Sequence, residues 1–183
     1  MAKLKVPVGQ ADHSLGDEQA PVTLVEYGDY ECPHCGHAHP IIQAVRKHFG
    51  SQLRFVFRNF PLTQIHPHAE MAAEAAEFAA AKGRFWEMHD TIFENQTRLG
   101  MPWLAEAAGK LGLSSDELKT SVANHEFLQR IKDDFMSGVR SGVNGTPTFF
   151  INGERYEESW EFEDLVGAIE ARLPKKTERR KVS

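Results

Sequence analysis

Cys32 and Cys35 are the only cysteines in the sequence, and two residues separate them. At the start of a helix, this spacing brings two sulfur atoms close enough for a disulfide with little movement of the backbone. With no other cysteine, the chain can build neither a disulfide framework nor a four-cysteine zinc site. The two residues therefore act as a pair: a redox couple, part of a metal site, or two inert thiols.

The surroundings of the pair favour a reactive Cys32. It lies near the first turn of a predicted helix, where free backbone N–H groups and the positive end of the helix dipole favour a thiolate. His34 lies between the two cysteines and can add a positive charge or a hydrogen bond. In redox-active proteins such surroundings lower the pKa of a thiol from about 8.5 to about 3.5–7.5. An acidic attacking cysteine stabilises the reduced form, which makes the disulfide oxidising.

Cys35 lies one turn further along and is expected to be less exposed, as a resolving cysteine that attacks a mixed disulfide. For that attack its thiol must lose a proton. Glu26, six residues before Cys32 in an apolar segment, is the candidate base, because burial would raise the pKa of its carboxyl group toward a useful value. The alternative for Glu26 is a half-exposed glutamate on a strand.

A metal site is the competing interpretation of this segment. Cys32 and Cys35 together with His37 and His39 offer four ligands, but His39 is four residues past Cys35, whereas His37 turns to a different face of the helix. Ligands from one short helix rarely close a tetrahedron. We therefore favour the redox pair over structural zinc, and expect both histidines on the exposed surface of the helix.

The segments around the pair predict a strand, a helix and a second strand. Residues 21–28 are a short, apolar, β-branched run that ends in glycine, and residues 53–61 are a second such run that stops at Pro61. Between them, residues 33–48 carry apolar side chains at helical spacing, and Pro40 is expected to kink this helix. A right-handed crossover makes the two strands parallel.

A long helical block and a hairpin follow. Residues 67–140 have helical patterning throughout, and the first helix carries small residues that permit close packing. Its alanine stripe, and the glutamates that lie off the stripe, are Ala69, Ala72, Ala73, Ala76, Ala79 and Ala80, and Glu70, Glu74 and Glu77. Within residues 145–156, Asn152-Gly153 is a two-residue hairpin signal. Residues 160–173 close the pattern as an amphipathic helix.

Several other residues could do chemistry but are expected to have structural roles. His66 and His68 lie where the second strand meets the helical block, and packing of that loop and helix start is favoured over a place in an active-site groove. His13 is expected in a turn. Three aromatic residues of the helical block are expected in its core rather than in a substrate groove: Phe85, Trp86 and Trp103.

Length and composition fit one globular domain with an insertion. The chain has 183 residues, of which 41% are hydrophobic, and its net charge of -5 argues against a general nucleic-acid binder. No apolar run is long enough for a signal core or a membrane span, so the chain as written is predicted to be cytoplasmic. A chain whose leader had been removed would look the same and would be periplasmic or extracytoplasmic. The basic end is expected to be a solvated tail, with Lys175, Lys176, Arg179, Arg180 and Lys181.

The ordered motifs resemble the DsbA-like thiol:disulfide oxidoreductases of the thioredoxin superfamily. They are "CPHC" after a strand, "RNFPL", the helical block that begins "HPHAEMAAEAAEFA", and "GTPTFFING". The resemblance covers nearly the whole chain, and it implies a thioredoxin fold with a helical insertion and no prosthetic group.

The resemblance also implies roles for individual residues. Cys32 matches the attacking cysteine and Cys35 the resolving one, with Pro33 and His34 as the dipeptide that tunes them. Glu26 matches the buried acidic position of the superfamily. Residue 147 matches a cis proline that faces the disulfide, and the residue before it offers backbone hydrogen bonds to an extended substrate; here these are Pro147 and Thr146. Strongly oxidising members have valine instead of this threonine, so the direction of electron flow stays open.

The sequence therefore predicts an α/β, thioredoxin-like protein with an inserted helical domain. Residues 1–66 and 141–174 would form the thioredoxin-like parts, 67–140 the insertion and 175–183 the tail. The predicted function is disulfide exchange with protein or peptide thiols, recycled by a separate redox partner, without nucleic-acid binding or membrane insertion. The alternatives are a zinc-binding protein, and a non-enzymatic redox sensor or peptide-binding module that uses the groove beside the proline.

Overall fold

The computed structural model describes residues 2–174, so the basic tail predicted for residues 175–183 lies outside the described residues. The elements are β1 (His13–Leu15), β2 (Val22–Gly28), α1 (Pro33–Phe49), η1 (Gly50–Gln52), β3 (Leu53–Asn59), α2 (Ala69–Ala81), α3 (Phe85–Phe93), η2 (Gln96–Arg98), α4 (Met101–Lys110), α5 (Ser115–Ala123), α6 (Leu128–Arg140), β4 (Thr148–Ile151), β5 (Glu154–Tyr156) and α7 (Phe162–Glu170).

One five-stranded sheet organises the chain, in the order β1-β3-β2-β4-β5. The predicted crossover is confirmed, since β2 and β3 pair in parallel from Val22 opposite Leu53 to Gly28 opposite Asn59. The predicted hairpin is also confirmed: β4 and β5 are antiparallel around Asn152 and Gly153, both of which have positive φ. The helix after β2 runs without interruption through Pro40.

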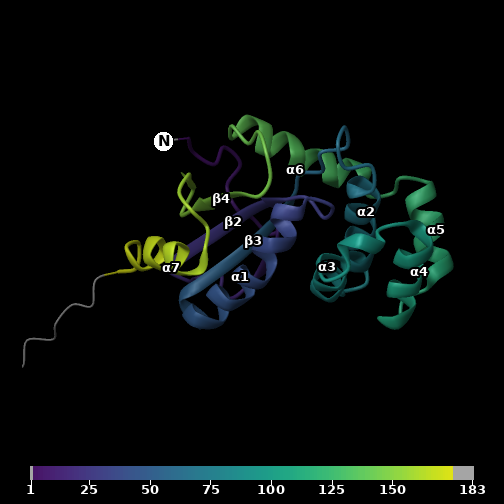
Figure 1. Cartoon of the computed structure of the whole chain (residues 1–183), viewed down its shortest axis with the longest axis horizontal. Coiled ribbons are helices and arrows are strands. Elements are labelled where there is room, and N and C mark those ends of the chain that lie inside the picture. The colour runs from purple at the N-terminus through teal and green to yellow at the C-terminus, as the bar shows by residue number, and fades with distance from the viewer. Residues whose placement is uncertain (1, 175–183) are drawn as a thin grey trace, which may run out of the picture.

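Helices cover both faces of the sheet (Figure 1). On one face, α1 and α7 pack over the side chains that alternate strand residues send toward them, such as Leu24 and Phe55. On the other face, α6 covers a smaller cluster that includes Val25 and Tyr27. Successive side chains of a strand point to opposite faces of the sheet, so each strand contributes to both clusters. Because Val25 and Tyr27 face α6, the side chain of Glu26 between them faces α1.

The helical block is inserted in the chain between β3 and β4. Its helices α2–α5 gather at one end of the sheet (Figure 1). The predicted alanine stripe of α2 is buried except for Ala80, which is half-buried. Ser114 caps α5 by accepting a hydrogen bond from the backbone N–H of Glu117. Two glutamates that we expected off the buried stripe, Glu74 and Glu77, are buried as well. Helix α2 is enclosed by α3, α4, α5 and α6, so it has little free face on which to expose them.

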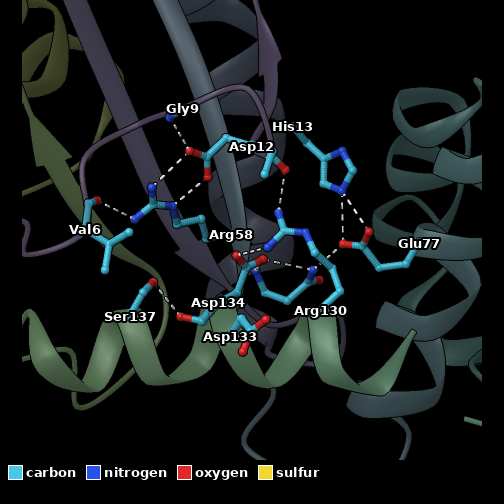
Figure 2. Close-up of polar contacts among 12 residues, drawn as sticks. Val6, Gly9, Asp12, His13, Arg58, Glu77, Arg130, Asp133, Asp134 and Ser137 are labelled. Atoms are coloured by element: carbon cyan, nitrogen blue, oxygen red, sulfur yellow. Dashed lines mark hydrogen bonds and ion pairs between the residues drawn. The ribbon is translucent and has the colours of Figure 1, made fainter. Parts of the chain in front are cut away.

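A buried polar network joins the sheet to α6 (Figure 2). Arg58 of β3 donates from Nε and Nη2 to the carboxylate of Asp12, at 2.7 and 3.0 Å, and donates from Nη1 to the carbonyl of Val6 and the hydroxyl of Tyr27. On α6, Arg130 pairs with Asp134, whose carboxylate accepts from the backbone N–H of Asn59. The N-terminal segment is thus fixed to the face of the sheet that α6 covers.

The turn predicted at His13 is wrong. Residues His13–Leu15 form β1, which pairs antiparallel with the edge of β3. The imidazole of His13 stacks on Phe85, and its Nε2 lies 2.9 Å from a carboxylate oxygen of Glu77 (Figure 2). These partners lie far along the chain, so the local sequence could not indicate them.

Within residues 2–174, no helix combines the length and the apolar character needed to cross a membrane.

Candidate redox site

The two cysteines begin α1, at the ends of the central strands. Cys32 is the N-cap residue, and Pro33 occupies the first turn, where its missing N–H has no helical partner to lose. Both cysteines are free thiols and buried. The Cys32 thiol donates to the carbonyl oxygen of Thr146 at 3.3 Å, and the Cys35 sulfur accepts from the backbone N–H of Asp29 at 3.4 Å.

The environments of the two thiols shift their pKa values in opposite directions. The pKa of Cys32 is lowered to about 5, first by a hydrogen bond from the Cys35 thiol, and further by contacts with Thr146 and with the backbone N–H groups of His34 and Cys35, against the effect of burial. Burial, with the nearby charges of Glu26 and Cys32, raises the pKa of Cys35 well above its usual value. Cys32 is therefore a thiolate at neutral pH beside a protonated Cys35.

Glu26 lies on the face of β2 that α1 covers. Its strand neighbours are Phe57 of β3 and Phe149 of β4, and the residue is only 2% exposed. Burial, assisted by the charge of Cys32, raises the pKa of its carboxyl group to about 8. The half-exposed alternative for Glu26 is wrong.

The histidines of the motif have different positions. His34 is exposed, and it contributes to the low pKa of Cys32 through its backbone N–H. His37 is exposed as expected, with Nε2 3.1 Å from Glu161. The expectation of an exposed His39 is wrong: the side chain is 8% exposed, stacks on Phe93 and has Nε2 3.5 Å from Asp90 of α3. Helix α3 covers this face of α1.

Thr146 and Pro147 lie in the loop between α6 and β4 and reach the site from there. Their peptide bond is cis, as the family resemblance implied. The hydroxyl oxygen of Thr146 is buried and has no hydrogen-bond partner in the described part of the chain. Beyond Pro147 the surface is hollowed over about 360 Å³. The hollow is lined by Pro147, Thr148, Phe149, Arg155, Tyr156 and Trp160, with Glu157 and Glu158.

Two acid–histidine pairs hold the loop before Cys32. The buried carboxylate of Asp29 accepts from the backbone N–H of Leu62 and lies 2.7 Å from Nδ1 of His66. Glu31 lies 2.8 Å from Nδ1 of His68. His66 and His68 therefore pack the loop at the start of the helical block, as expected, and connect it to the redox motif. Sequence reasoning missed Asp29 and Glu31, although acids next to the motif and histidines after β3 were a visible signal.

Gln96 is a second residue that sequence reasoning missed. Its Nε2 donates to the carbonyl oxygens of Tyr30 and Cys32, both at 2.9 Å. A Cβ at Gly36 would lie 2.0 Å from the Gln96 side-chain oxygen, so a glycine at this position permits the contact. The helical block thus contacts the cysteine motif directly, and no local sequence signal marks a glutamine in a short 3₁₀ helix for this role.

The sheet order, the dithiol at the start of α1 and the helical insertion define a thioredoxin-fold protein of the DsbA-like kind. A family model described as thioredoxin matches residues 9–171, and the chain belongs to this family. The structure of oxidised BdbD from Bacillus subtilis superposes with a TM-score of 0.85 at 24% identity, covering 94% of this chain and 98% of that one. A thioredoxin-like oxidoreductase from Silicibacter pomeroyi superposes with a TM-score of 0.78 at 24% identity, covering 89% and 92%. These likenesses establish the fold.

Sequence relatives add a different context. The chain is 44% identical over 167 residues to the Na(+)/H(+) antiporter NhaA 1 of Salinispora arenicola. The alignment covers 91% of this chain and 26% of the antiporter. The chain thus spans about a quarter of the length of the curated relatives that it matches. The family and the cysteine pair support a thiol–disulfide oxidoreductase as the general reaction type.

Proposed function

We propose that the chain exchanges disulfides with protein or peptide thiols through Cys32 and Cys35. The observation that carries the proposal is the opposite shift of the two pKa values, with Cys32 at about 5 and Cys35 well above its usual value. The lower pKa makes Cys32 the better nucleophile at neutral pH and the better leaving group from a mixed disulfide. The pair is thus differentiated into an attacking and a resolving cysteine.

Oxidation of a substrate uses the Cys32–Cys35 disulfide. A substrate thiolate attacks the Cys32 sulfur, the Cys32–Cys35 bond breaks, and Cys35 leaves as a thiolate that takes up the proton of Glu26. A second substrate thiolate then attacks its partner sulfur in the mixed disulfide, and Cys32 leaves as a thiolate. The substrate loses two electrons and the pair gains them. Reduction of a substrate disulfide runs through the same steps in reverse.

Glu26 is proposed as the group that exchanges a proton with Cys35. A carboxyl group with a pKa of about 8 is largely protonated at neutral pH, yet it can ionise without a large cost. It can therefore give a proton to the departing Cys35 thiolate and remove one when Cys35 attacks. His34 and Pro33 are proposed as tuning residues, through the backbone N–H of the first and the helix start set by the second.

Thr146 and Pro147 are proposed to hold the substrate as an extended segment beside Cys32. Contact of the Thr146 carbonyl with the Cys32 sulfur puts this backbone next to the reacting atom. The hollow beyond Pro147 has a mainly polar lining that includes Arg155, and Tyr156 and Trp160 add ring surface, so it offers both polar groups and rings to neighbouring substrate side chains. Unfolded protein segments fit such a site better than compact small thiols because they present both backbone and side chains.

Net direction follows from the potential of the pair and from its redox partner. A reducing cytoplasm would keep both thiols reduced and favour substrate reduction or exchange, whereas an oxidising compartment would favour substrate oxidation. The antiporter activity in the relatives' names belongs to proteins about four times as long as the matched segment. For the segment that they share with this chain, we propose thiol–disulfide exchange.

Two assays test the proposal: reduction of insulin, and oxidative refolding of a reduced, unfolded protein. Cys32→Ser is expected to lose both activities, whereas Cys35→Ser is expected to accumulate a mixed disulfide with the substrate. His37→Gln, at an exposed side chain, is the control and should retain both activities. Wild-type protein that binds unfolded peptides but has neither activity would instead be a binding module or sensor. Stoichiometric zinc that is lost in Cys35→Ser would establish the zinc alternative.

A further inference from the structure

We propose that this protein binds a divalent transition-metal ion, with Zn²⁺ as the probe, between α1 and α3. The ligands are His39 of α1 and His89 and Asp90 of α3. One potential ligand atom from each residue lies within 4.8 Å of the others. The site is separate from the cysteine pair, and the proposal does not depend on the dithiol chemistry.

One distance between ligand atoms already suits a small cation. Zinc binds imidazole nitrogen and carboxylate oxygen at about 2.0–2.2 Å, so the ligand atoms of a tetrahedral site lie about 3.3–3.5 Å apart. Nε2 of His39 and Oδ1 of Asp90 already lie 3.5 Å apart. The rings of His39 and His89 are in edge-to-face contact, with centroids 5.4 Å apart and planes inclined by 62°. All three ligand atoms lie within 4.8 Å of one another, so binding would draw them together by side-chain rotation.

The second nitrogen of His89 has the partner that a metal-binding histidine needs. Its Nδ1 lies 3.0 Å from the hydroxyl of Tyr30. With the proton on Nδ1, this nitrogen donates to the hydroxyl oxygen, and Nε2 keeps the lone pair that would bind the ion. Histidines that bind metals commonly hold their other ring nitrogen in such a hydrogen bond, which fixes the orientation of the ring. Aromatic residues wall the buried side of the site: Phe57, Phe85, Trp86 and Phe93.

Access to the site is from the side of Asp90, whose side chain is 43% exposed, whereas both histidines are buried. Exposed Gln43 lies at this entrance, with its amide nitrogen 3.1 Å from Nε2 of His39. This amide N–H places partial positive charge beside the His39 nitrogen. Rotation of this side chain would clear the entrance and could present its oxygen to the ion.

A second group of potential ligands provides an internal comparison. Glu70 and Glu74 of α2 and His125 also have ligand atoms within 4.8 Å of one another. His125 is exposed and its Nδ1 is already engaged by Glu74 at 2.9 Å, so this group offers one free imidazole nitrogen at most. Two imidazoles and one carboxylate suit zinc and neighbouring transition metals better than carboxylates with a single histidine do.

The consequence of binding would be a link between the redox helix and the helical block. His39 lies four residues after Cys35 on α1, and Tyr30 lies two residues before Cys32. An ion held by both helices would therefore restrain the segment on either side of the cysteine pair relative to α3.

The test is calorimetric titration of Zn²⁺ into the full chain, without a histidine tag, in a Cys32→Ser/Cys35→Ser background that removes thiolate ligands. We expect one ion per chain and a rise in melting temperature with zinc. Asp90→Asn, at the partly exposed ligand, should weaken binding by more than the about 10–100-fold that outer partners typically contribute. Tyr30→Phe should weaken it about 10-fold. Co²⁺ in place of Zn²⁺ should give a spectrum of nitrogen and oxygen ligands.

His125→Gln is the matched control and should leave the affinity unchanged. Asp90→Asn tests the site even if substitution of buried His89 prevents folding, and His39→Gln provides a third variant. Absence of saturable zinc binding overturns the proposal. Binding that Asp90→Asn and His39→Gln leave unchanged also overturns it, as does binding that is lost in His125→Gln, because the ion would then lie at the other group.

Discussion

Residues 26 and 27 of β2 point to opposite faces of the same sheet, and the pKa values of the buried carboxyl groups on the two faces shift in opposite directions. On the α1 face, Glu26 is buried without a cationic partner among residues 2–174, and its pKa rises to about 8. On the α6 face, burial also raises the pKa of Asp12, but hydrogen bonds and charge from Arg58 outweigh it and leave the pKa below its usual value. Tyr27 adds its hydroxyl to the same arginine.

The difference separates a structural carboxylate from one suited to proton transfer. A paired carboxylate stays ionised throughout the neutral range, so it fixes the chain but cannot take up a proton there. An unpaired buried carboxyl group titrates near neutral pH, at a cost to the stability of the fold. Burial alone does not identify a candidate acid or base in this protein. The absence of a compensating arginine is what distinguishes Glu26 from Asp12.

The largest change in the free energy of unfolding is expected from a substitution on the α6 face. Asp12→Ala leaves the guanidinium of Arg58 buried without its carboxylate, and removal of one partner from a buried pair costs about 3–5 kcal/mol. Urea unfolding of wild type and variant measures the loss. Glu18→Ala, at an exposed acid of the same segment, should change the free energy of unfolding little. If Asp12→Ala were as stable as Glu18→Ala, the network would not be what anchors the N-terminal segment.

Substitution of Glu26 is expected to stabilise the fold, unlike substitution of Asp12. Its folded pKa is raised from 4.5 to about 8, so the native state retains a proton that the unfolded state releases, and stability falls as pH rises from about 4.5 to 8. Glu26→Gln removes this loss. In the reduced protein the variant should be more stable than wild type by up to about 3 kcal/mol at pH 7, with almost no difference at pH 4.

Unfolding measured at several pH values between 4 and 9 checks this prediction, and disulfide exchange by the same variant should slow. A pH-independent gain in stability would mean that the carboxyl group does not titrate in this range. A gain without slower exchange would confirm the buried acid but remove it from the proton transfer with Cys35.

The sequence predicted the elements of both faces better than their contacts. Strands, crossover, helical block and hairpin followed from apolar periodicity and from Asn152-Gly153, which are local signals. β1 was missed because three residues show no periodicity and pair only through the edge of β3. Burial of His39 depends on α3, about fifty residues further along the chain. Local spacing therefore indicated Cys32 and Cys35, and an acid in the apolar strand before them indicated Glu26. The roles proposed for Thr146 and Pro147 needed the family resemblance.

The smallest predicted effect concerns the tuning of Cys32 on the α1 face. The Thr146 hydroxyl is buried and lacks a partner while Cys32 is a thiol, and its contact with the ionised sulfur helps to lower the pKa of Cys32 to about 5. Thr146→Val keeps the shape and removes this donor. We expect the pKa of Cys32 to rise by about one unit, worth ~1.4 kcal/mol, and the potential of the pair to become more reducing by about 30 mV.

Titration of thiolate absorbance and equilibration with glutathione measure the two shifts. Thr148→Val is the matched control, because the Thr148 hydroxyl donates to the carbonyl of Gly145 and not to the cysteine. An unchanged Cys32 pKa in Thr146→Val, or an equal shift in Thr148→Val, would mean that the backbone N–H groups and Cys35 alone hold the thiolate. The α1 face would then tune its nucleophile with backbone N–H groups and the second thiol, and Glu26 would remain a buried acid without a cationic partner among residues 2–174.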